Sequence, residues 1–392
     1  MKLETQAVHV GDRRKPSAAV PVTTPIVTAA SFIYDDIETV DRVFGDEIQG
    51  YAYARYGSPT NDALEELITA LEGGAGSVAT ASGMLAVQVA IQTALTDRRK
   101  SVVAASALYG ATLKLLTSVF DPLGVEVRFV DICDRAAVEA AIAEAKPGCV
   151  VMESVSNPLL RVADIAAVAR HARAAGAALV VDNTFATPLL ARPIELGANF
   201  SVHSLTKYLS GHGDVMGGAI TCDAEHLPTL RALSSTCGPI LGPFESYLAM
   251  RGIKTFPLRM ERQCRNAAEV AAWLATHPRV AKVNYPGDPS HPDAETVARQ
   301  FSGGLRGAMV SFDLKDAGRE QVFAFINKLK LVVRATSLGD VHTMVLYPAI
   351  ASHRDLAPKQ RLRMGIGDGL VRLSVGIEAM EDVIADLDQA LR

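Results

Sequence analysis

The sequence lacks the features that mark several large classes of protein. It has only five cysteines in 392 residues, an odd and widely spaced set without a C-x-x-C pair. Such a set predicts neither a disulfide framework nor a zinc site, and it fits free thiols in a reducing cytoplasm. The 39 lysines and arginines are outnumbered by 43 aspartates and glutamates, which gives a net charge of −4. This balance argues against a nucleic-acid-binding protein.

Long apolar runs are missing as well. The first residues contain no apolar segment of the kind found in secretory signals. The uncharged stretch 73–96 is rich in polar side chains and glycine, and the alanine-rich stretch 162–181 is interrupted by charged residues. We therefore expect no membrane-spanning helix and a cytoplasmic protein.

Several common motifs of catalysis and cofactor binding are also absent. The dinucleotide fingerprint G-x-G-x-x-G fails at both places where it begins, Gly74 and Gly211. No G-x-x-x-x-G-K-[ST] and no H-E-x-x-H occur. These absences argue against a nicotinamide oxidoreductase, a P-loop enzyme and a catalytic metal ion, so no metal is expected.

What the sequence does contain falls into three regions. Residues 1–60 hold several prolines and no long helical period, which predicts an extended arm. Because such an arm has little core of its own, it must lie on a larger surface, such as a second subunit. Residues 61–250 alternate apolar runs with alanine-rich helical segments, and residues 251–392 have the pattern of a smaller α/β domain.

The alternation in the middle region predicts an α/β fold with a large, mostly parallel sheet that is covered on both faces. The expected strands are 77–82, 101–106, 125–132, 149–154, 177–183 and 199–204, and the expected helices are 61–71, 84–95, 110–120, 135–145 and 162–175. Beyond them we expect a long helix over 249–277, interrupted near Pro257, strands at 308–314, 331–338 and 370–377, and a last helix at 381–392. A ligand site is expected at the carboxyl ends of the parallel strands.

Polar residues follow two of these strands. Asp182 stands where a buried strand ends, and a buried carboxylate is costly unless it meets a cation; a turn or helix cap is the alternative role. Ser204, Thr206 and Lys207 follow the next strand in a glycine-rich segment. Two hydroxyls and an amine could bind a phosphate, and a buried lysine could form a Schiff base. The alternative is a surface lysine in a flexible loop.

Two other strand ends add an anion site and a ring. Gly83 and Met84 begin a helix, where free backbone N–H groups can bind an anion. Tyr109 follows the next strand and could offer its ring face, although ordinary packing is the alternative for a single tyrosine. Together with Asp182 and Lys207, these features supply a phosphate anchor, a stacking ring, a carboxylate and an amine. This is the set that pyridoxal phosphate requires.

At these positions the sequence resembles the Cys/Met-metabolism family of pyridoxal-phosphate enzymes. These are the trans-sulfuration enzymes, which include cystathionine γ-lyase, cystathionine γ-synthase, methionine γ-lyase and the acylhomoserine sulfhydrylases. The resemblance covers nearly the whole chain. It rests on TQAVHVG (5–11), YARYGSPT (53–60), TASGM (80–84), LYGAT (108–112), VVDNTFATP (180–188), SVHSLTKYLSGHGDVMGG (201–218), SLGD (337–340) and LVRLSVGIE (370–378).

The resemblance implies fold type I, the aspartate aminotransferase-like fold, with a large, mostly parallel sheet domain and a smaller C-terminal α/β domain. It also implies roles for residues around the cofactor. Lys207 would hold pyridoxal phosphate as a Schiff base and move protons, and Asp182 would pair with the pyridine nitrogen. Tyr109 would stack on the ring and protonate the leaving group. Thr184 would lie by the ring and orient Asp182.

The family pattern also implies a shared active site. Backbone N–H groups of Gly83 and Met84 would bind the phosphate together with the hydroxyls of Ser204 and Thr206. Residues at the positions of Tyr53 and Arg55 reach the phosphate of a neighbouring subunit's cofactor in this family. A homo-oligomer is therefore implied, at least a dimer and usually a tetramer built from two such dimers.

For the substrate, the resemblance implies an amino acid whose carboxylate is held by Asn157 and Arg372, with Ser337 nearby. An arginine suits this task because its guanidinium binds a carboxylate in a bidentate manner. The implied reaction is γ-elimination from a γ-substituted homoserine-type amino acid such as cystathionine, methionine or an analogue. The alternatives are γ-replacement by a thiol, as in cystathionine γ-synthase or an O-acylhomoserine sulfhydrylase, and β-elimination from cystathionine.

The sequence departs from its relatives at several positions. Ala111 stands where methionine γ-lyases have cysteine, and Thr336 stands where cystathionine enzymes commonly have glutamate. His342 is unusual and could face the distal part of the substrate or have no role. Ser58 replaces an asparagine, a change that we expect to be tolerated. These departures lead to the hypothesis of a different leaving group, such as an acyl ester or the nitrogen–oxygen group of canavanine. A non-catalytic binding protein is the other class considered, but both Lys207 and Asp182 are present.

Overall fold

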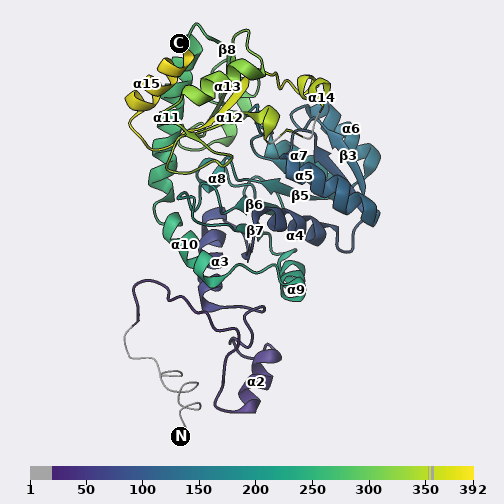
Figure 1. Ribbon diagram of the computed structural model, residues 1–392. Coiled ribbons are helices and arrows are strands. Elements are labelled where there is room, and N and C mark those ends of the chain that lie inside the picture. The colour runs from purple at the N-terminus through teal and green to yellow at the C-terminus, as the bar shows by residue number, and fades with distance from the viewer. Residues whose placement is uncertain (1–19, 352, 355–356) are drawn as a thin grey trace.

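The computed structural model describes residues 20–351, 353–354 and 357–392 (Figure 1). The TQAVHVG match at 5–11 and the first part of the predicted arm lie outside the described residues. Two sheets organise the rest of the chain, one of seven strands and one of five. None of the described helices is long and apolar enough to cross a membrane.

The large sheet has the strand order β1-β7-β6-β5-β4-β2-β3. Its strands are β1 (Gly76–Thr80), β2 (Ser101–Ala105), β3 (Glu126–Val130), β4 (Cys149–Glu153), β5 (Ala178–Asp182), β6 (Phe200–Ser204) and β7 (Gly218–Cys222). The strands β2 to β6 pair in parallel, whereas β7 is antiparallel to both β6 and β1. The prediction of a large, mostly parallel sheet is therefore confirmed. The strand β7 is an addition, since a segment that begins with two glycines gave no strand signal.

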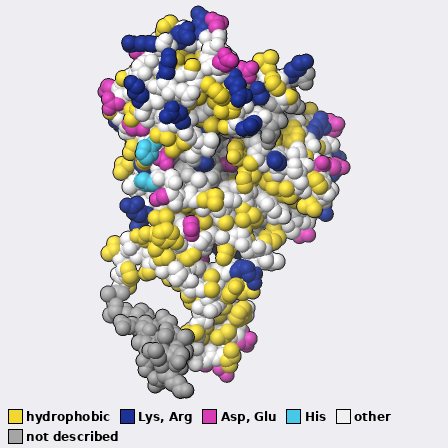
Figure 2. All heavy atoms as spheres, in the orientation of Figure 1, with side chains coloured by type: hydrophobic (Ala, Val, Ile, Leu, Met, Phe, Trp, Pro, Cys, Tyr) yellow, Lys and Arg dark blue, Asp and Glu magenta, His cyan; other side chains and the backbone are white. Residues whose placement is uncertain are grey.

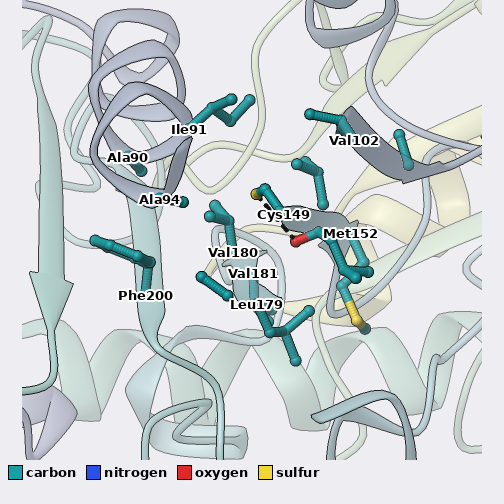
Figure 3. Packing of buried hydrophobic residues seen from close by; sticks show 14 of the residues in the cluster. Ala90, Ile91, Ala94, Val102, Cys149, Met152, Leu179, Val180, Val181 and Phe200 are labelled. Atoms are coloured by element: carbon teal, nitrogen blue, oxygen red, sulfur yellow. Dashed lines mark hydrogen bonds between the residues drawn. The ribbon is translucent and has the colours of Figure 1, made fainter. Parts of the chain in front are cut away.

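Both faces of this sheet are buried. Val78 and Ala79 are neighbours on β1 but belong to different core clusters. Because successive side chains of a strand point to opposite faces, a core lies on each face. Figure 3 shows one of them, where Ala90 and Ile91 of α4 lie near Val180 of β5.

The helices around the large sheet are α3 (Pro59–Glu72), α4 (Gly83–Leu95), α5 (Gly110–Leu115), α6 (Arg135–Ala145), α7 (Ile165–Ala174), α8 (Thr187–Leu190) and α9 (Leu227–Cys237). Five of them, α3 to α7, lie where the apolar periodicity predicts helices, whereas α8 and α9 were not predicted. A π-turn (Leu116–Phe120) and a 3-10 turn (Asp121–Leu123) continue α5, which accounts for the longer helix predicted over 110–120.

The small sheet has the order β10-β11-β12-β9-β8. Its strands are β8 (Val280–Asn284), β9 (Met309–Leu314), β10 (Val333–Arg334), β11 (Met344–Leu346) and β12 (Leu370–Ser374), and its helices are α12 (Ala294–Gln300), α13 (Arg319–Lys328), α14 (Pro358–Arg363) and α15 (Met380–Leu391). The strand predicted over 331–338 is shorter, because the chain leaves the sheet and turns toward Lys207. Strands β8 and β11 were not predicted.

The predicted long helix is two helices, α10 (Pro243–Ile253) and α11 (Phe256–Thr276). Pro257 lies in the first turn of α11, where a missing backbone N–H costs nothing. The break between the two helices therefore lies just before the proline, which is part of the first turn of the second helix.

The described part of the arm extends away from both sheets (Figure 1). It contains one short helix, α2 (Ile37–Phe44), which Asp36 caps at its N-terminus. Many of its apolar side chains are exposed, among them Val22, Ile33 and Phe44. Figure 2 shows hydrophobic side chains on the surface of the lower extension of the molecule.

Candidate active site

The carboxyl ends of three parallel strands bring the candidate residues together. Glu153, Asp182 and Ser204 are the last residues of β4, β5 and β6. Since these strands are neighbours in the sheet, their ends meet at one edge. This is the edge at which α/β sheets bind ligands.

Asp182 is a partly buried residue at the end of β5. Its Oδ1 accepts a hydrogen bond from the backbone N–H of Thr184 at 3.0 Å. Burial raises the pKa of Asp182, while the hydrogen bonds of Thr184 and the nearby His203 lower it in part. Within the described part of the chain, no lysine or arginine forms an ion pair with Asp182. The carboxylate is therefore suited to a cationic N–H donor from a ligand.

Thr184 joins the ends of two strands. Its Oγ1 accepts a hydrogen bond from the backbone N–H of Ser204 at 2.9 Å, while its own N–H binds Asp182. This fixes the distance between the carboxylate and the residues that follow β6.

The start of α4 forms a cradle next to Ser204. Ser82 caps the helix by accepting the N–H of Leu85 at 3.2 Å. A Cβ on Gly83 would lie 2.8 Å from the Ser204 Cβ, so only glycine allows this approach. The first N–H groups of a helix have no partner inside it, and here they lie beside the hydroxyl of Ser204. Thr206 lies close by and accepts the N–H of Gly217 at 3.2 Å.

Lys207 and Arg372 are linked by Ser337. Lys207 Nζ donates to Ser337 Oγ at 2.8 Å, and Arg372 Nη2 donates to the Ser337 carbonyl at 3.2 Å. Burial lowers the pKa of Lys207, and the charge of Arg372 lowers it further. The result is an amine that gives up its proton more readily than an exposed lysine.

Arg372 has further capacity to bind an anion. Its Nη1 donates to Asn157 Oδ1 at 2.9 Å, while its Nε has no hydrogen-bond partner among the described residues. Burial lowers the pKa of Arg372 to about 10, and the side chain forms no ion pair with any described carboxylate. A buried, incompletely paired guanidinium suits a bound carboxylate.

Tyr109 stands at the start of α5 with 44% of the residue exposed. Its backbone N–H donates to Glu153 Oε1 at 2.6 Å. Glu153 was not predicted as a site residue, although the strand CVVME (149–153) ends in a carboxylate just as ALVVD (178–182) does. That shared pattern is the signal that would have found it.

A buried pair, Glu72 and His203, connects the ends of two of these strands. Glu72, the last residue of α3, contacts Nε2 of His203 and accepts a hydrogen bond from Asn183 Nδ2 at 3.3 Å. Both Glu72 and His203 are almost fully buried. Asn183 directly follows Asp182, and His203 directly precedes Ser204. Glu72 therefore connects the ends of β5 and β6. No pattern in the sequence predicted the contact between Glu72 and His203.

Tyr53 and Arg55 are not brought to this cluster. Arg55 Nη1 donates to the carbonyl of Ser235 in α9, and its guanidinium lies 4.6 Å from the ring centroid of Tyr56. Tyr53 is 46% exposed. Within the described chain, neither residue has a hydrogen bond or ring contact with Lys207 or Asp182.

Of the positions that depart from relatives, Thr336 and His342 are exposed, Ala111 is partly buried and Ser58 is buried. Thr336 is exposed, beside Ser337. The His342 side chain is 65% exposed, and its Nδ1 lies 2.8 Å from Oδ1 of the buried Asp340. Ala111 lies in the first turn of α5, two residues after Tyr109.

Comparisons with known proteins agree with this arrangement. The family model "Cys/Met metabolism PLP-dependent enzyme" matches residues 4–392. The chain belongs to this family. An L-methionine gamma-lyase from Fusobacterium nucleatum subsp. polymorphum is 41% identical over 392 residues, with 99% of this chain and 98% of the relative covered. An O-succinylhomoserine sulfhydrylase from Pseudomonas aeruginosa is 39% identical over 390 residues, with 99% and 94% covered.

Solved structures of the Cys/Met-metabolism family have the same fold. Cystathionine gamma synthase from Xanthomonas oryzae pv. oryzae, in complex with cystathionine, superposes with a TM-score of 0.87 at 37% identity. The match covers 94% of this chain and 92% of that structure. The chain is thus a fold-type I, pyridoxal-phosphate-dependent enzyme of the trans-sulfuration group, as the sequence predicted.

The residues present fit this cofactor. The site offers a partly buried carboxylate that forms no ion pair with a described lysine or arginine, a helix start that only glycine allows so close to a serine, and a partly buried lysine amine. These suit the pyridine nitrogen, the phosphate and the aldehyde of pyridoxal phosphate, in that order.

Proposed function

We propose that this enzyme catalyses γ-elimination from a γ-substituted homoserine-type amino acid. The proposal rests on the contacts of Ser337. Its hydroxyl accepts a hydrogen bond from the Lys207 amine, and its carbonyl accepts one from the Arg372 guanidinium. An amine beside a carboxylate-binding arginine can remove a proton from the α-carbon of a bound amino acid. The lyase among the similar proteins supports elimination.

The proposed roles follow from the contacts. Arg372 and Asn157 bind the substrate carboxylate, with Ser337 beside them. Lys207 Nζ accepts the α-proton, since its lowered pKa makes the neutral amine available. Tyr109 donates a proton to the leaving group, because its ring is partly exposed at the edge of the site. These roles can be tested one residue at a time.

The cofactor-binding roles complete the proposal. Bound pyridoxal phosphate supplies an electron sink for the carbanion that forms at the α-carbon. Lys207 holds its aldehyde, Asp182 its pyridine nitrogen with Thr184 as support, and Tyr109 covers its ring. The phosphate is held by the residues at the start of α4 and after β6, namely Gly83, Met84, Ser204 and Thr206.

We further propose that Tyr53 and Arg55 complete the phosphate site of a second copy of the chain. In one chain they lie on the arm, apart from Lys207, and the arm exposes many apolar side chains. A homo-oligomer would bury that surface. The three-part division into an arm (1–60), a cofactor domain (61–250) and a small domain (251–392) belongs to the same proposal, and the cytoplasmic location remains a prediction.

The leaving group is the open choice within this proposal. Ala111, Thr336 and His342 differ from the residues expected in methionine and cystathionine lyases, which favours another γ-substituent such as an acyl ester or a nitrogen–oxygen group. The second candidate is γ-replacement by a thiol, favoured by the similarity to a sulfhydrylase. β-Elimination from cystathionine is the third.

A substrate panel tests the proposal. Purified enzyme with pyridoxal phosphate is given cystathionine, methionine, O-acetyl- and O-succinylhomoserine and canavanine, each with and without a thiol. The proposal predicts release of 2-oxobutanoate from at least one of them without thiol, or of homoserine where water adds at the γ-carbon after the γ-substituent has left. Thioether formation only with thiol would show a synthase or sulfhydrylase, and pyruvate from cystathionine would show β-elimination.

A further inference from the structure

A second carboxyl group lies beside Asp182 and has no role in the reaction proposed above. Glu153 ends β4, and its register partner Asp182 ends β5. Paired residues of neighbouring strands point to the same face of a sheet, so the two carboxyl groups share one side of the site. Only 8% of Glu153 is exposed. Burying a carboxyl group is costly unless it is hydrogen-bonded or paired.

The one hydrogen bond that the described structure gives this carboxyl leads to Tyr109. Glu153 Oε1 accepts the backbone N–H of Tyr109 at 2.6 Å. Tyr109 is the N-cap residue of α5, and its side chain does not cap the helix. The residue is 44% exposed, so packing alone holds the ring less firmly than it would hold a buried one. The bond to Glu153 thus connects the tyrosine to the strand end that lies next to Asp182.

Glu153 and Asp182 differ in how strongly their surroundings stabilise the charged form of the carboxyl group. Burial raises the pKa of Glu153 well above its usual value, the charge of Asp182 raises it further, and the Tyr109 N–H opposes this only in part. Asp182 is also raised by burial but is stabilised as an anion by Thr184 and His203. Two buried carboxyl groups side by side do not both ionise readily. A neutral Glu153 still offers an acceptor oxygen and leaves the negative charge to Asp182.

We propose that Glu153 is a positioning residue that fixes the main chain of Tyr109, so that the tyrosine ring covers the cofactor ring anchored by Asp182. The inference rests on the proposed function for the roles of Tyr109 and Asp182. Glu153 acts through Tyr109 and not on the substrate. What the task requires is a hydrogen-bond acceptor at Oε1, and a negative charge there is not required.

The test compares Glu153→Gln, which keeps an acceptor oxygen, with Glu153→Leu, which removes it at similar volume. Three quantities are measured: the dissociation constant of pyridoxal phosphate from the apoenzyme, the visible circular dichroism of the bound cofactor, and kcat and KM separately. Glu153→Gln should resemble the parent enzyme in all three. Glu153→Leu leaves the Tyr109 N–H without a partner and should weaken cofactor binding by about 5- to 100-fold. It should also change the circular dichroism and lower kcat more than it raises KM.

Asp386→Asn serves as the matched control. Asp386 is another buried carboxyl that accepts backbone N–H groups, here those of Lys330, Leu331 and Val332 in the small domain. Its substitution should lower the melting temperature and leave cofactor affinity and circular dichroism unchanged. If Glu153→Leu does not fold, Glu153→Met replaces it with the same criteria.

Two results would overturn the inference. One is a Glu153→Leu enzyme with the parent's cofactor affinity and circular dichroism. The other is a Glu153→Gln enzyme as defective as Glu153→Leu, which would show that the charge matters and the acceptor does not. Neither result depends on which substrate the parent enzyme uses, so the proposed function is judged separately by the substrate panel.

Discussion

The seven-stranded sheet and the arm that precedes it differ in how their apolar side chains are placed. The strands β1, β2, β4 and β7 are buried along their whole length. The arm leaves Val20, Val22, Ile33 and Ile37 largely exposed. Large exposed apolar patches are uncommon on monomers and mark surfaces that bind something.

The same contrast holds for the predicted site residues. Within one chain, hydrogen bonds join Asp182, Thr184 and Ser204 at the strand ends. Others join Lys207, Ser337, Arg372 and Asn157. The predicted site residues on the arm, Tyr53 and Arg55, lie apart from them. One part of the site is therefore built by a single chain, and we propose that a second copy completes the other part. The following predictions test the two parts separately.

The largest effect is expected from Lys207→Ala, which removes the amine at the centre of the single-chain part. Loss of a general acid–base group lowers turnover by about 10²–10⁴-fold, and loss of the attachment point for the cofactor adds to this. Steady-state assays with the best substrate of the panel measure it. The exposed Lys315 gives the control, since Lys315→Ala should be as active as the parent. Near-normal turnover of Lys207→Ala would exclude the proposed mechanism.

The next effect concerns the support beneath the strand ends. Glu72→Ala leaves the buried His203 without its hydrogen-bond partner and opens a cavity, which together cost about 2–5 kcal/mol of folding free energy. Denaturant unfolding of the apoenzyme should show this loss. Glu261→Ala removes a carboxylate from an exposed pair with Arg265 and should cost less than about 1 kcal/mol. Equal stability of the two variants would show that Glu72 does not brace the site.

Arg372→Lys tests the contribution of the small sheet to the site. Lysine keeps the positive charge, but its ammonium group lacks the planar set of donors with which a guanidinium can bind Asn157 and a carboxylate at once. We expect kcat/KM to fall by about 10- to 100-fold, mainly through a higher KM. Arg265→Lys on the exposed face of α11 is the matched control. A fall in kcat with unchanged KM would contradict a role in holding the substrate.

The smallest effect lies outside both regions, at Asp386. Burial disfavours its charge, but the N–H groups of Lys330, Leu331 and Val332 outweigh burial, so its pKa is lowered. A lowered folded-state pKa stabilises the protein above the unfolded pKa of about 3.9, and this contribution is lost as the pH falls through the folded value. The parent should exceed Asp386→Asn in stability by about 1–3 kcal/mol at neutral pH. The difference should shrink below about pH 4, and a difference independent of pH would contradict this account.

Much of this arrangement could be predicted from the sequence, and the limits have physical causes. Buried parallel strands give continuous apolar runs, so their ends, and with them Asp182 and Lys207, could be placed at one edge. The contact between Lys207 and Ser337 spans 130 positions, and no local pattern specifies it. The family resemblance supplied Ser337 and Arg372.

Other features escaped prediction for similar reasons. The glycines at the start of β7 hide a strand whose burial comes from its neighbours on both sides. Glu72 has the sequence context of an exposed helix end, and only the fold buries it against His203. The placement of Tyr53 and Arg55 depends on another molecule, and it stays a prediction.

The central claim is that the arm of one chain completes the site of another, and complementation tests it directly. Lys207→Ala and Arg55→Ala chains with different tags are produced together, and the mixed oligomers are purified and assayed. In a symmetric dimer with shared sites, one of the two sites of each hybrid is intact, so a purified hybrid should have about half the parent's activity. If each site is built from one chain alone, the hybrid contains no intact site. Activity no higher than the average of the two single variants would then contradict the account.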